Sequence, residues 1–338
     1  MGLNNYYDYF AFGYMLGTMF LGIYLLYISY CYLLKIDVNR KLYFLTIYSE
    51  NGKLPITLKS MDIQLAENCK EFSETTRQIS NFNNNNFFKW LAGIIDGDGN
   101  FDVRNINSKL VLKAIRIKLH NRDIRILSKI QNTLHIGRIR SDANKPHSMW
   151  IISKKEEMLF LINNINGLIR LKVPGLKKSC DYLGIDFKQA DYNLQPNDPY
   201  LSGLVDTDGS IVFNYTGNRI ECNLEFEYNE YTNKLNLDNV IPNYRPSKVY
   251  REHRNTIAFR YQNVREMVFL YDYFMMNRLF SDFKFYRVSK IKEFILIRNY
   301  KNDPKDSLEF KKYADFVLNW IQYKNPTWHK VKFINKIR

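Results

Sequence analysis

The chain has 338 residues, of which 46% are hydrophobic, and a formal net charge of +15 from 49 basic and 34 acidic side chains. This length gives room for two domains and an extension, and this hydrophobic content is enough to build their cores. The charge excess goes beyond what solubility requires and predicts a polyanionic partner or an acidic membrane surface. The four cysteines form no CxxC pair and the five histidines show no metal-ligand spacing, so neither a disulfide framework nor a zinc site is expected.

An uncharged segment runs from Tyr9 to Leu34 and is long enough to cross a bilayer. Lys35 follows it and only Asp8 precedes it, so a membrane helix here would place its C-terminal side in the positive-inside compartment. The lack of a basic residue before the segment argues against a secretory signal or a transit peptide. Three interpretations remain: a membrane anchor, a dispensable leader translated from upstream sequence, and a buried helix of a soluble domain.

An asparagine-rich stretch at residues 81–86 is predicted to be a linker. Residues 42–80, which precede it, show no clear period. Residues 1–86 are therefore interpreted as an N-terminal extension, and the first folded repeat is expected to begin at residue 87.

Two stretches of the chain share one pattern. Residues 90–101 read WLAGIIDGDGNF, and residues 200–211 read YLSGLVDTDGSI, an offset of 110 residues. In the first copy, Leu91, Ile94 and Ile95 recur at helical spacing. Each copy is therefore predicted to be a short apolar helix that ends in acidic residues.

Close packing of these two helices would bring acidic residues together. Gly93 and Gly203 have no side chains, which helps only where another backbone comes very close, so the helices are predicted to pack through these glycines. Asp98 and Asp208 would then lie at adjacent helix C-termini. The helix dipole disfavours a lone carboxylate there and favours one that binds a cation, which predicts a divalent metal site with oxygen ligands.

The segments LAGIIDGDG and LSGLVDTDG resemble the LAGLIDADG motif of homing endonucleases and intron maturases, in the branch that carries two motifs in one chain. The resemblance extends from about residue 87 to about residue 298. It implies an α+β fold of two pseudo-symmetric repeats, 87–188 and 200–299, each ordered helix-strand-strand-helix-strand-strand-helix around a four-stranded antiparallel sheet. The two sheets would form a saddle-shaped DNA-binding surface, with a linker at 189–199 and a helical tail at 300–338.

Hydrophobic periodicity within the repeats agrees with this order. The strand expected at residues 110–120 alternates cleanly at Ile115, Ile117 and Leu119, which leaves basic residues on its other face. The other expected elements of the first repeat are a strand at 101–105, a helix at 124–134, a hairpin from 137–140 to 149–152, and a helix at 155–165. The helix at 124–134 is expected to have Asp123 as its N-cap. Its apolar stripe is expected to consist of Ile124, Leu127, Ile130 and Leu134. In the second repeat, strands are expected at 211–215, 221–227, 248–253 and 256–261, and a helix at 264–277. In the tail, a stripe of Tyr313, Phe316, Val317, Trp320 and Ile321 is expected to pack on the second repeat.

Hydrolysis of a phosphodiester requires a nucleophilic water, neutralisation of the phosphate and help for the leaving oxygen, all of which metal ions held by carboxylates supply. In the family, the acid at the eighth motif position is the metal ligand. The resemblance therefore assigns Asp98 and Asp208 as catalytic ligands of Mg²⁺, one for each DNA strand. Asp96 and Asp206, at the sixth position, are expected to be structural.

The family also carries a lysine near each active centre, late in the repeat. Lys178 and Lys290 match it, at 80 and 82 residues after the respective motif acids, and the alternative is that they are ordinary surface lysines. A polar residue at the end of the second strand positions water in the family, which assigns this role to His120. The corresponding residue of the second repeat is Glu227, and an acid there departs from the family pattern.

DNA contacts are expected from the outward faces of the sheets. The early strand of the second half is acidic, with Glu221, Glu225 and Glu227, so the two halves are predicted to bind an asymmetric target. The candidate DNA-binding residues are Arg104, Lys113, Arg116, Lys118, Arg138 and Arg140 in the first half and Lys248, Arg251, Arg254 and Arg260 in the second.

Together these features predict a monomeric, Mg²⁺-dependent, intron-encoded endonuclease that cuts both strands of a long DNA site. The alternative is a maturase that binds its own group I intron RNA and assists mRNA splicing. A third, more remote interpretation is a membrane protein with a degenerate nuclease domain. The composition, rich in Tyr, Phe, Asn, Lys and Ile, is typical of an AT-rich organelle genome and favours a mitochondrial location, in the matrix or at the inner membrane through residues 9–34.

Overall fold

The computed structural model describes residues 85–142 and 144–337. The chain divides into two units, Met1–Phe82 and Asn83–Arg338, and every element discussed below belongs to the second. The uncharged segment at residues 9–34, on which the anchor, leader and buried-helix interpretations depend, lies outside the described residues. Within the described part, no helix is both long and apolar enough to cross a membrane.

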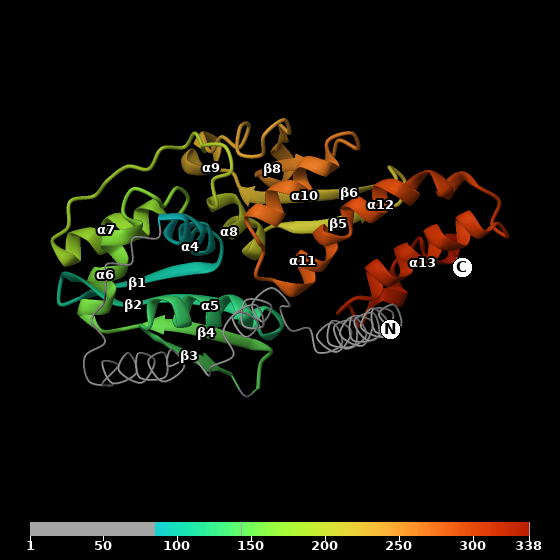
Figure 1. Cartoon of the computed structure of the whole chain (residues 1–338). Helices are drawn as coiled ribbons and strands as arrows, with labels where there is room; N and C mark the ends of the chain where they lie inside the picture. The colour runs from blue at the N-terminus through green and yellow to red at the C-terminus, as the bar shows by residue number, and fades with distance from the viewer. Residues whose placement is uncertain (1–84, 143, 338) are drawn as a thin grey trace, which may run out of the picture. The chain divides into compact units, whose positions relative to one another are not determined.

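The first repeat is built around one antiparallel sheet with strand order β1-β2-β4-β3 (Figure 1). Its elements are α4 (Asn85–Asp98), β1 (Gly99–Ile106), β2 (Lys109–His120), the 3-10 turn η1 (Asn121–Asp123), α5 (Ile124–Leu134), β3 (Arg138–Ser141), β4 (His147–Ile152), α6 (Lys155–Ile165) and α7 (Val173–Leu183). Helix α4 begins inside the predicted asparagine linker. The earlier start is explained by Phe87 and Phe88, which are both buried and so belong to the packed helix.

The second repeat has the same arrangement, with strand order β5-β6-β8-β7. Its elements are α8 (Tyr200–Thr207), β5 (Ser210–Asn214), β6 (Arg219–Glu227), α9 (Glu230–Lys234), β7 (Ser247–Arg251), η2 (Glu252–Arg254), β8 (Thr256–Tyr261), α10 (Met267–Met276), α11 (Asp282–Ser289) and α12 (Ile291–Ile297). The predicted α+β class with two four-stranded antiparallel sheets is confirmed. Helices α7, α11 and α12 were not among the expected elements.

Strand β2 contains an irregularity that explains its uneven sequence pattern. Asp102 of β1 pairs with Ala114, but the next residue, Val103, pairs with Leu112, so Lys113 is an extra residue on β2. A β-bulge of this kind interrupts the two-residue alternation. After the bulge, the alternation predicted at Ile115, Ile117 and Leu119 holds, and all three side chains are buried.

Helix α5 has the predicted bounds and the predicted N-cap residue, but its buried stripe differs from the predicted one. Its buried stripe includes Ile126, whereas Ile124 is exposed. At 100° per residue, position 124 lies roughly 200° from position 126 and so faces away from the sheet. Asp123 occupies the N-cap position, yet its side chain makes no cap hydrogen bond, because it bonds elsewhere.

Helices α4 and α8 pack against each other through their glycines. A Cβ atom on Gly93 would lie 2.9 Å from the amide nitrogen of Leu204, 3.0 Å from the Cα of Gly203, and closer still to the carbonyl oxygen of Tyr200. A Cβ atom on Gly203 would meet the backbone of α4 in the same way. Because all these atoms are backbone, no side-chain movement could make room for a methyl group.

The C-terminal tail folds back onto the second repeat. In α13 (Leu308–Gln322), the predicted stripe is buried, and Phe310 and Ala314 extend it. The Tyr313 hydroxyl donates to the Asn218 side chain at 3.0 Å, and the indole nitrogen of Trp320 donates to the carbonyl oxygen of Arg287 at 3.1 Å. The 3-10 turns η3 (Arg298–Asn302) and η4 (Trp328–Lys330) and helix α14 (Ile334–Ile337) complete the chain.

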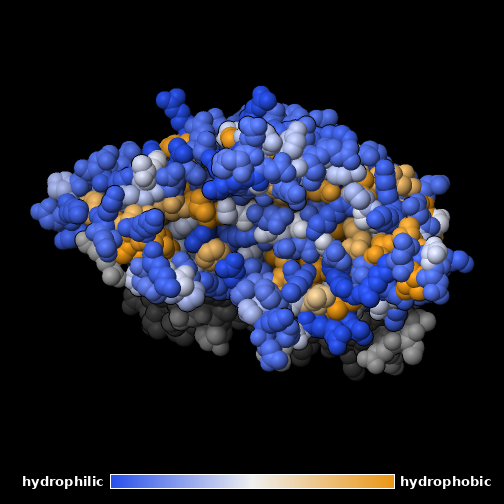
Figure 2. All heavy atoms as spheres, turned by 180° about the vertical axis from the view of Figure 1, so that it is seen from behind, coloured by the Kyte–Doolittle hydropathy of each residue, from blue (hydrophilic) through white to orange (hydrophobic). Residues whose placement is uncertain are grey.

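The face of the molecule drawn in Figure 2 is predominantly hydrophilic, with apolar side chains exposed in small groups. The most exposed large hydrophobic side chains of the described residues are Leu296, Leu308 and Met276.

Candidate active site and nucleic-acid face

The two motif acids lie at the C-terminal ends of the packed helices. Asp98 is the last residue of α4, and Asp208 caps α8. A methyl group on Gly97 would lie 3.3 Å from Oδ2 of Asp208, which shows how near the two helix ends are. Burial raises the pKa of the Asp98 carboxyl, and the negative charge of Asp208 raises it further. Burial also raises the pKa of Asp208. Each carboxylate therefore favours a bound cation over its free charged form.

Asp96 connects α4 to the second motif and to the end of its own repeat. Its Oδ2 accepts hydrogen bonds from the Tyr200 hydroxyl at 2.6 Å and from the Arg170 amide at 2.7 Å. Its Oδ1 accepts a hydrogen bond from the Lys172 amide at 2.8 Å. A buried carboxylate with these partners positions backbone, as expected for a sixth-position acid.

Asp206 makes the matching contacts in the other direction. Its carboxylate accepts hydrogen bonds from the indole nitrogen of Trp90 at 3.1 Å and from the amides of Phe280 at 3.0 Å and Ser281 at 2.9 Å. Burial raises the pKa of Asp206 to about 6, so the group is ionised at neutral pH. Trp90 and Tyr200 occupy equivalent motif positions, so each motif helix donates a hydrogen bond to the sixth-position acid of the other.

The lysines that face this centre are not the predicted ones. Nζ of Lys172 donates to the carbonyl oxygens of Gly97 and Gly99. Nζ of Lys284 donates to three carbonyl oxygens at the end of α8, those of residues 205, 206 and 207, at 2.8–2.9 Å. Burial lowers the pKa of both lysines, while the nearby carboxylates act in the opposite direction. Two cations therefore compensate the negative ends of the two helix dipoles.

The predicted lysines, Lys178 and Lys290, are not the ones whose ammonium groups bond to the helix ends, and their catalytic role stays a prediction. Lys178 lies on an exposed side of α7. Lys290 pairs with Glu293 at 2.7 Å, between α11 and α12. Both lie six residues after the lysines that reach the helix ends. Because those lysines are separated by the same interval, spacing alone could not distinguish the two pairs.

The placement of these four lysines leads to a prediction about which of them DNA cleavage requires. Replacing Lys172 or Lys284 with Met is expected to slow DNA cleavage by about 100-fold, because a cation beside the reacting phosphate is lost. The matched controls Lys178→Met and Lys290→Met are expected to change the rate less than threefold. The measurement is the single-turnover cleavage rate of a labelled duplex. A loss confined to the control pair would reverse the assignment.

The donor set at the seam suits a hard divalent cation. Among the described residues, no group of three or more His, Cys, Asp or Glu side chains forms a closed metal site. Asp98 and Asp208 could supply two carboxylate ligands, which would leave most of the coordination open. Mg²⁺ binds in this way, through one or two carboxylates, several waters and substrate phosphates.

The strand register relates His120 to Glu227. His120 pairs with His147 at the end of β2, and Glu227 pairs with Thr256 at the end of β6. Nδ1 of His120 accepts a hydrogen bond from the Arg122 amide at 3.2 Å, and its ring lies 5.7 Å from that of His147. The two predicted positions are equivalent, and the water-positioning role of His120 stays a prediction.

The outward face of the first sheet is basic. Arg116 and Arg138 both pair with Ile151, and Lys118 and Arg140 both pair with Met149. Directly paired residues point to the same side of a sheet, so these four basic side chains share the face opposite the buried one.

Arg104 and Lys113 lie further along the first sheet. Arg104 binds the Asp102 carboxylate through two nitrogens, at 2.8 and 2.9 Å, and Arg116 reaches the same carboxylate at 2.6 Å. The hydrogen bond from Arg104 holds the pKa of Asp102 below its usual range. Lys113 is the exposed extra residue of the bulge. Part of the positive charge is therefore already compensated at this end.

One candidate of the second sheet was wrong. Lys248 pairs with Phe259, which also pairs with Leu224, and both of these partners are buried. Lys248 therefore belongs to the inward side, where its Nζ donates to the carbonyl oxygen of Asn233 at 2.7 Å. Strand parity decides the face, and the edge position of β7 explains why this lysine is still exposed.

The other candidates of the second half keep their outward placement. Arg251 binds both oxygens of Glu225, at 3.0 and 3.1 Å. Arg260 pairs with Asn223 on the same face, and Arg254 is exposed in the turn η2. The ion pair with Glu225 removes most of the charge that Arg251 would otherwise offer to a phosphate.

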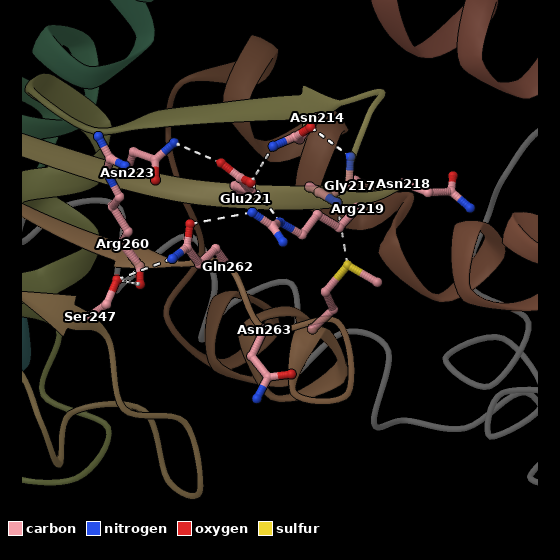
Figure 3. A network of polar contacts seen from close by, with 12 residues as sticks. Asn214, Gly217, Asn218, Arg219, Glu221, Asn223, Ser247, Arg260, Gln262 and Asn263 are labelled. Atoms are coloured by element: carbon pink, nitrogen blue, oxygen red, sulfur yellow. Dashed lines mark hydrogen bonds and ion pairs between the residues drawn. The ribbon is translucent and has the colours of Figure 1, made fainter.

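A polar network covers the same face near the β5–β6 turn, and sequence reasoning missed it (Figure 3). Oε1 of Glu221 accepts hydrogen bonds from Asn214 at 2.8 Å and from Arg219 at 2.6 Å. Arg219 also reaches the Gln262 side chain at 3.4 Å. A cleft of about 940 Å³ borders the network, and Arg219, Arg260 and Gln262 are among the residues that line it. Strand alternation in β6 was the available signal, since residues 219, 221 and 223 share one face.

The chain is similar in sequence to several known proteins. Residues 91–186 match the family model described as LAGLIDADG endonuclease. An intron-encoded RNA maturase of Saccharomyces cerevisiae is 31% identical over 156 residues, which cover 44% of this chain and 24% of the relative. Two intron-encoded DNA endonucleases of Dictyostelium discoideum are 26% and 23% identical, and the matches cover 55% and 77% of this chain and 70% and 82% of those relatives. The chain therefore spans only about a quarter of the length of the yeast maturase.

Solved structures give matches of low sequence identity. The meganuclease I-SmaMI, bound to uncleaveable DNA, is 12% identical with a TM-score of 0.47, over 68% of this chain and 97% of that one. The meganuclease I-CpaMI, bound to uncleaved DNA, is 17% identical with a TM-score of 0.46, over 68% and 97% of the respective chains.

Proposed function

We propose that this chain is a site-specific endonuclease of the LAGLIDADG family that cuts both strands of a DNA target. The observation that carries the proposal is the meeting of Asp98 and Asp208 at the ends of two packed helices, each with a lysine beside it. Both repeats lie in one chain, so a monomer contains both acids. No second copy is needed to complete the centre.

The chemistry assigned to the centre follows from its charges. A bound Mg²⁺ would neutralise the scissile phosphate and lower the pKa of a metal-bound water. Asp98 and Asp208 hold their carboxylates at the helix ends, where both residues are exposed and accessible to a phosphate. Lys172 and Lys284 place cations beside the same helix ends, where they also attract the phosphate. Each strand is assigned one acid and one lysine.

The two sheet faces are proposed to bind the DNA differently. The first carries Arg116, Lys118, Arg138 and Arg140 on its outward side, so its phosphate contacts make binding depend on salt. On the second, arginines are matched by the glutamates at 221, 225 and 227, which leaves pre-arranged polar groups suited to base edges. An asymmetric target follows from this difference.

The test of the proposed function is a cleavage assay with the full chain and Mg²⁺. One substrate is DNA that spans the uninterrupted insertion site of the gene's own intron, and the other is the same DNA with the intron inserted. We expect cleavage of the first substrate only. If neither is cut and the chain binds the intron RNA tightly, the endonuclease proposal fails and the maturase alternative replaces it.

The maturase alternative has one specific observation in its favour. The relative with 31% identity is named as an RNA maturase, and it matches 44% of this chain. A chain that serves both roles would lose cutting but keep splicing when Asp98 and Asp208 are both replaced by Asn. A mitochondrial location is proposed because a further yeast relative, 22% identical, is named a mitochondrial protein.

A further inference from the structure

We propose that a buried hydrogen bond between the two repeats, from Ser281 to Asp123, positions Lys284 and thereby sets the rate at which one of the two DNA strands is cut. The inference rests on the proposed endonuclease function. The Ser281 hydroxyl donates to Oδ1 of Asp123 at 2.6 Å, and both side chains are buried. Ser281 and Asp123 act through Lys284, so both are positioning residues.

Asp123 and Ser281 do not make the helix-capping hydrogen bonds that their positions would allow. Asp123 is the N-cap of α5 and Ser281 is the N-cap of α11, and neither side chain makes a cap hydrogen bond. Asp and Ser are among the best N-cap residues, so leaving the cap hydrogen bond unmade lowers the stability of the helix start. Each side chain instead bonds to the other across the boundary between the repeats. Local helix stability therefore does not explain this pair.

The bond acts on a segment that leads directly to the active centre. The backbone amide of Ser281 donates to Asp206 at 2.9 Å, next to the amide of Phe280. One turn of helix later, Lys284 donates to the carbonyl oxygens at the end of α8, beside Asp208. Ser281 thus fixes the start of α11 at two points, one in each repeat, and α11 carries the lysine.

Other side chains of the first repeat support the same segment. Arg125 forms an ion pair with Asp282. The guanidinium of Arg122 lies 5.2 Å from the ring of Phe283, and the ammonium of Lys129 lies 5.6 Å from that of Phe280. Cation–ring contacts of this kind are attractive, because the ring face carries partial negative charge. The first repeat therefore forms part of the second catalytic centre.

The equivalent contact, between segment 169–173 of the first repeat and segment 228–234 of the second, has no such bond among the described residues. Because His120 is equivalent to Glu227 in the strand register, Asp123 corresponds to Glu230, which is exposed and pairs with Lys234 at 3.8 Å. In the first repeat, the residue three before Lys172, where Ser281 stands before Lys284, is Ile169, which has no hydroxyl to donate. Across the described residues, no side-chain hydrogen bond or ion pair joins segment 169–173 to segment 228–234. Among the described residues, only the segment that carries Lys284 is joined in this way to the start of a helix in the opposite repeat.

The consequence is a difference between the two strand cleavages. Ser281→Ala removes the bond and frees the start of α11, while the contacts of Lys172 remain. We expect cleavage of the strand served by Lys284 to slow about tenfold, because small misplacement of a reacting group is costly. The other strand should change less than twofold, so nicked DNA accumulates.

The experiment uses the full chain and a duplex target with a different label on each strand, and it measures both single-turnover rates. Ser179→Ala is the matched control, because Ser179 is also fully buried but bonds only within α7, to the carbonyl oxygen of Gly175 at 2.8 Å. We expect this control to leave the ratio of the two rates unchanged. Asp123→Asn keeps an oxygen acceptor for Ser281 and should preserve the ratio, whereas Asp123→Ala should reproduce the bias.

A second readout does not depend on cleavage. Amide hydrogen exchange of residues 280–284, measured without metal, should rise in Ser281→Ala and stay unchanged in Asp123→Asn. Equal slowing of both strands, or unchanged exchange, would overturn the positioning role. If the unmodified chain cuts neither strand, the proposed function fails, and the exchange result then decides the structural role of the bond separately.

Discussion

Replacing Asp98 or Asp208 with Asn is expected to abolish double-strand cleavage and, without divalent metal, to raise the melting temperature. Each variant removes one ligand of the metal, so its own strand should be cut at least about 100-fold more slowly. Each also removes a negative charge at a helix C-terminus, next to a like charge, which destabilises the fold in the absence of a cation. The measurements are strand-specific cleavage and thermal unfolding with and without Mg²⁺.

The pH dependence of stability supplies the control. Burial raises the pKa of both carboxyls in the folded state. Their stabilising contribution is therefore complete below the ordinary value of 3.8 and is lost as pH rises through the raised pKa. Mg²⁺ competes with protons for these oxygens, so it should raise the melting temperature more at pH 8 than at pH 5. The Asn variants should lose this metal-dependent increase, and undiminished cutting of both strands by either variant would refute the ligand assignment.

Gly93→Ala is expected to have the largest effect on stability of any single substitution in the seam. Its new methyl group would overlap the backbone of α8 at Tyr200 and Leu204, so the two helices would have to move apart. We expect a loss of at least about 3 kcal/mol in the free energy of unfolding. Cleavage should also fall, since Asp98 and Asp208 separate with the helices. Urea unfolding followed by circular dichroism measures the loss.

Gly184→Ala is the control for the general cost of replacing glycine. Gly184 has a φ of +70°, and a Cβ atom there would meet nothing within 4 Å. The expected cost is about 1 kcal/mol, from the left-handed backbone conformation alone. If Gly93→Ala costs no more than Gly184→Ala, close packing of the seam is not what requires a glycine at position 93.

The positions of the lysines show why a site cannot be completed from spacing. Lys172 and Lys284 are 112 residues apart, and so are Lys178 and Lys290. Any pair at the repeat interval fits the pseudo-symmetry equally well. Only the fold shows that α7 turns Lys178 to solvent while the preceding residues bring Lys172 to the helix end. The error at Lys248 has a similar cause, because a one-residue difference in strand parity moves a side chain to the opposite face.

The sequence by itself determined the two-repeat organisation, the α+β class, the apolar motif helices and their two acids. These features depend on local periodicity and on a duplicated motif, both of which can be read along the chain. Tertiary structure alone decided which lysines meet Asp98 and Asp208, which basic residues share the outward faces, and that Asp123 bonds Ser281 rather than its own helix. Those relations join residues that are far apart in the chain, and they arise only when the helices and sheets pack.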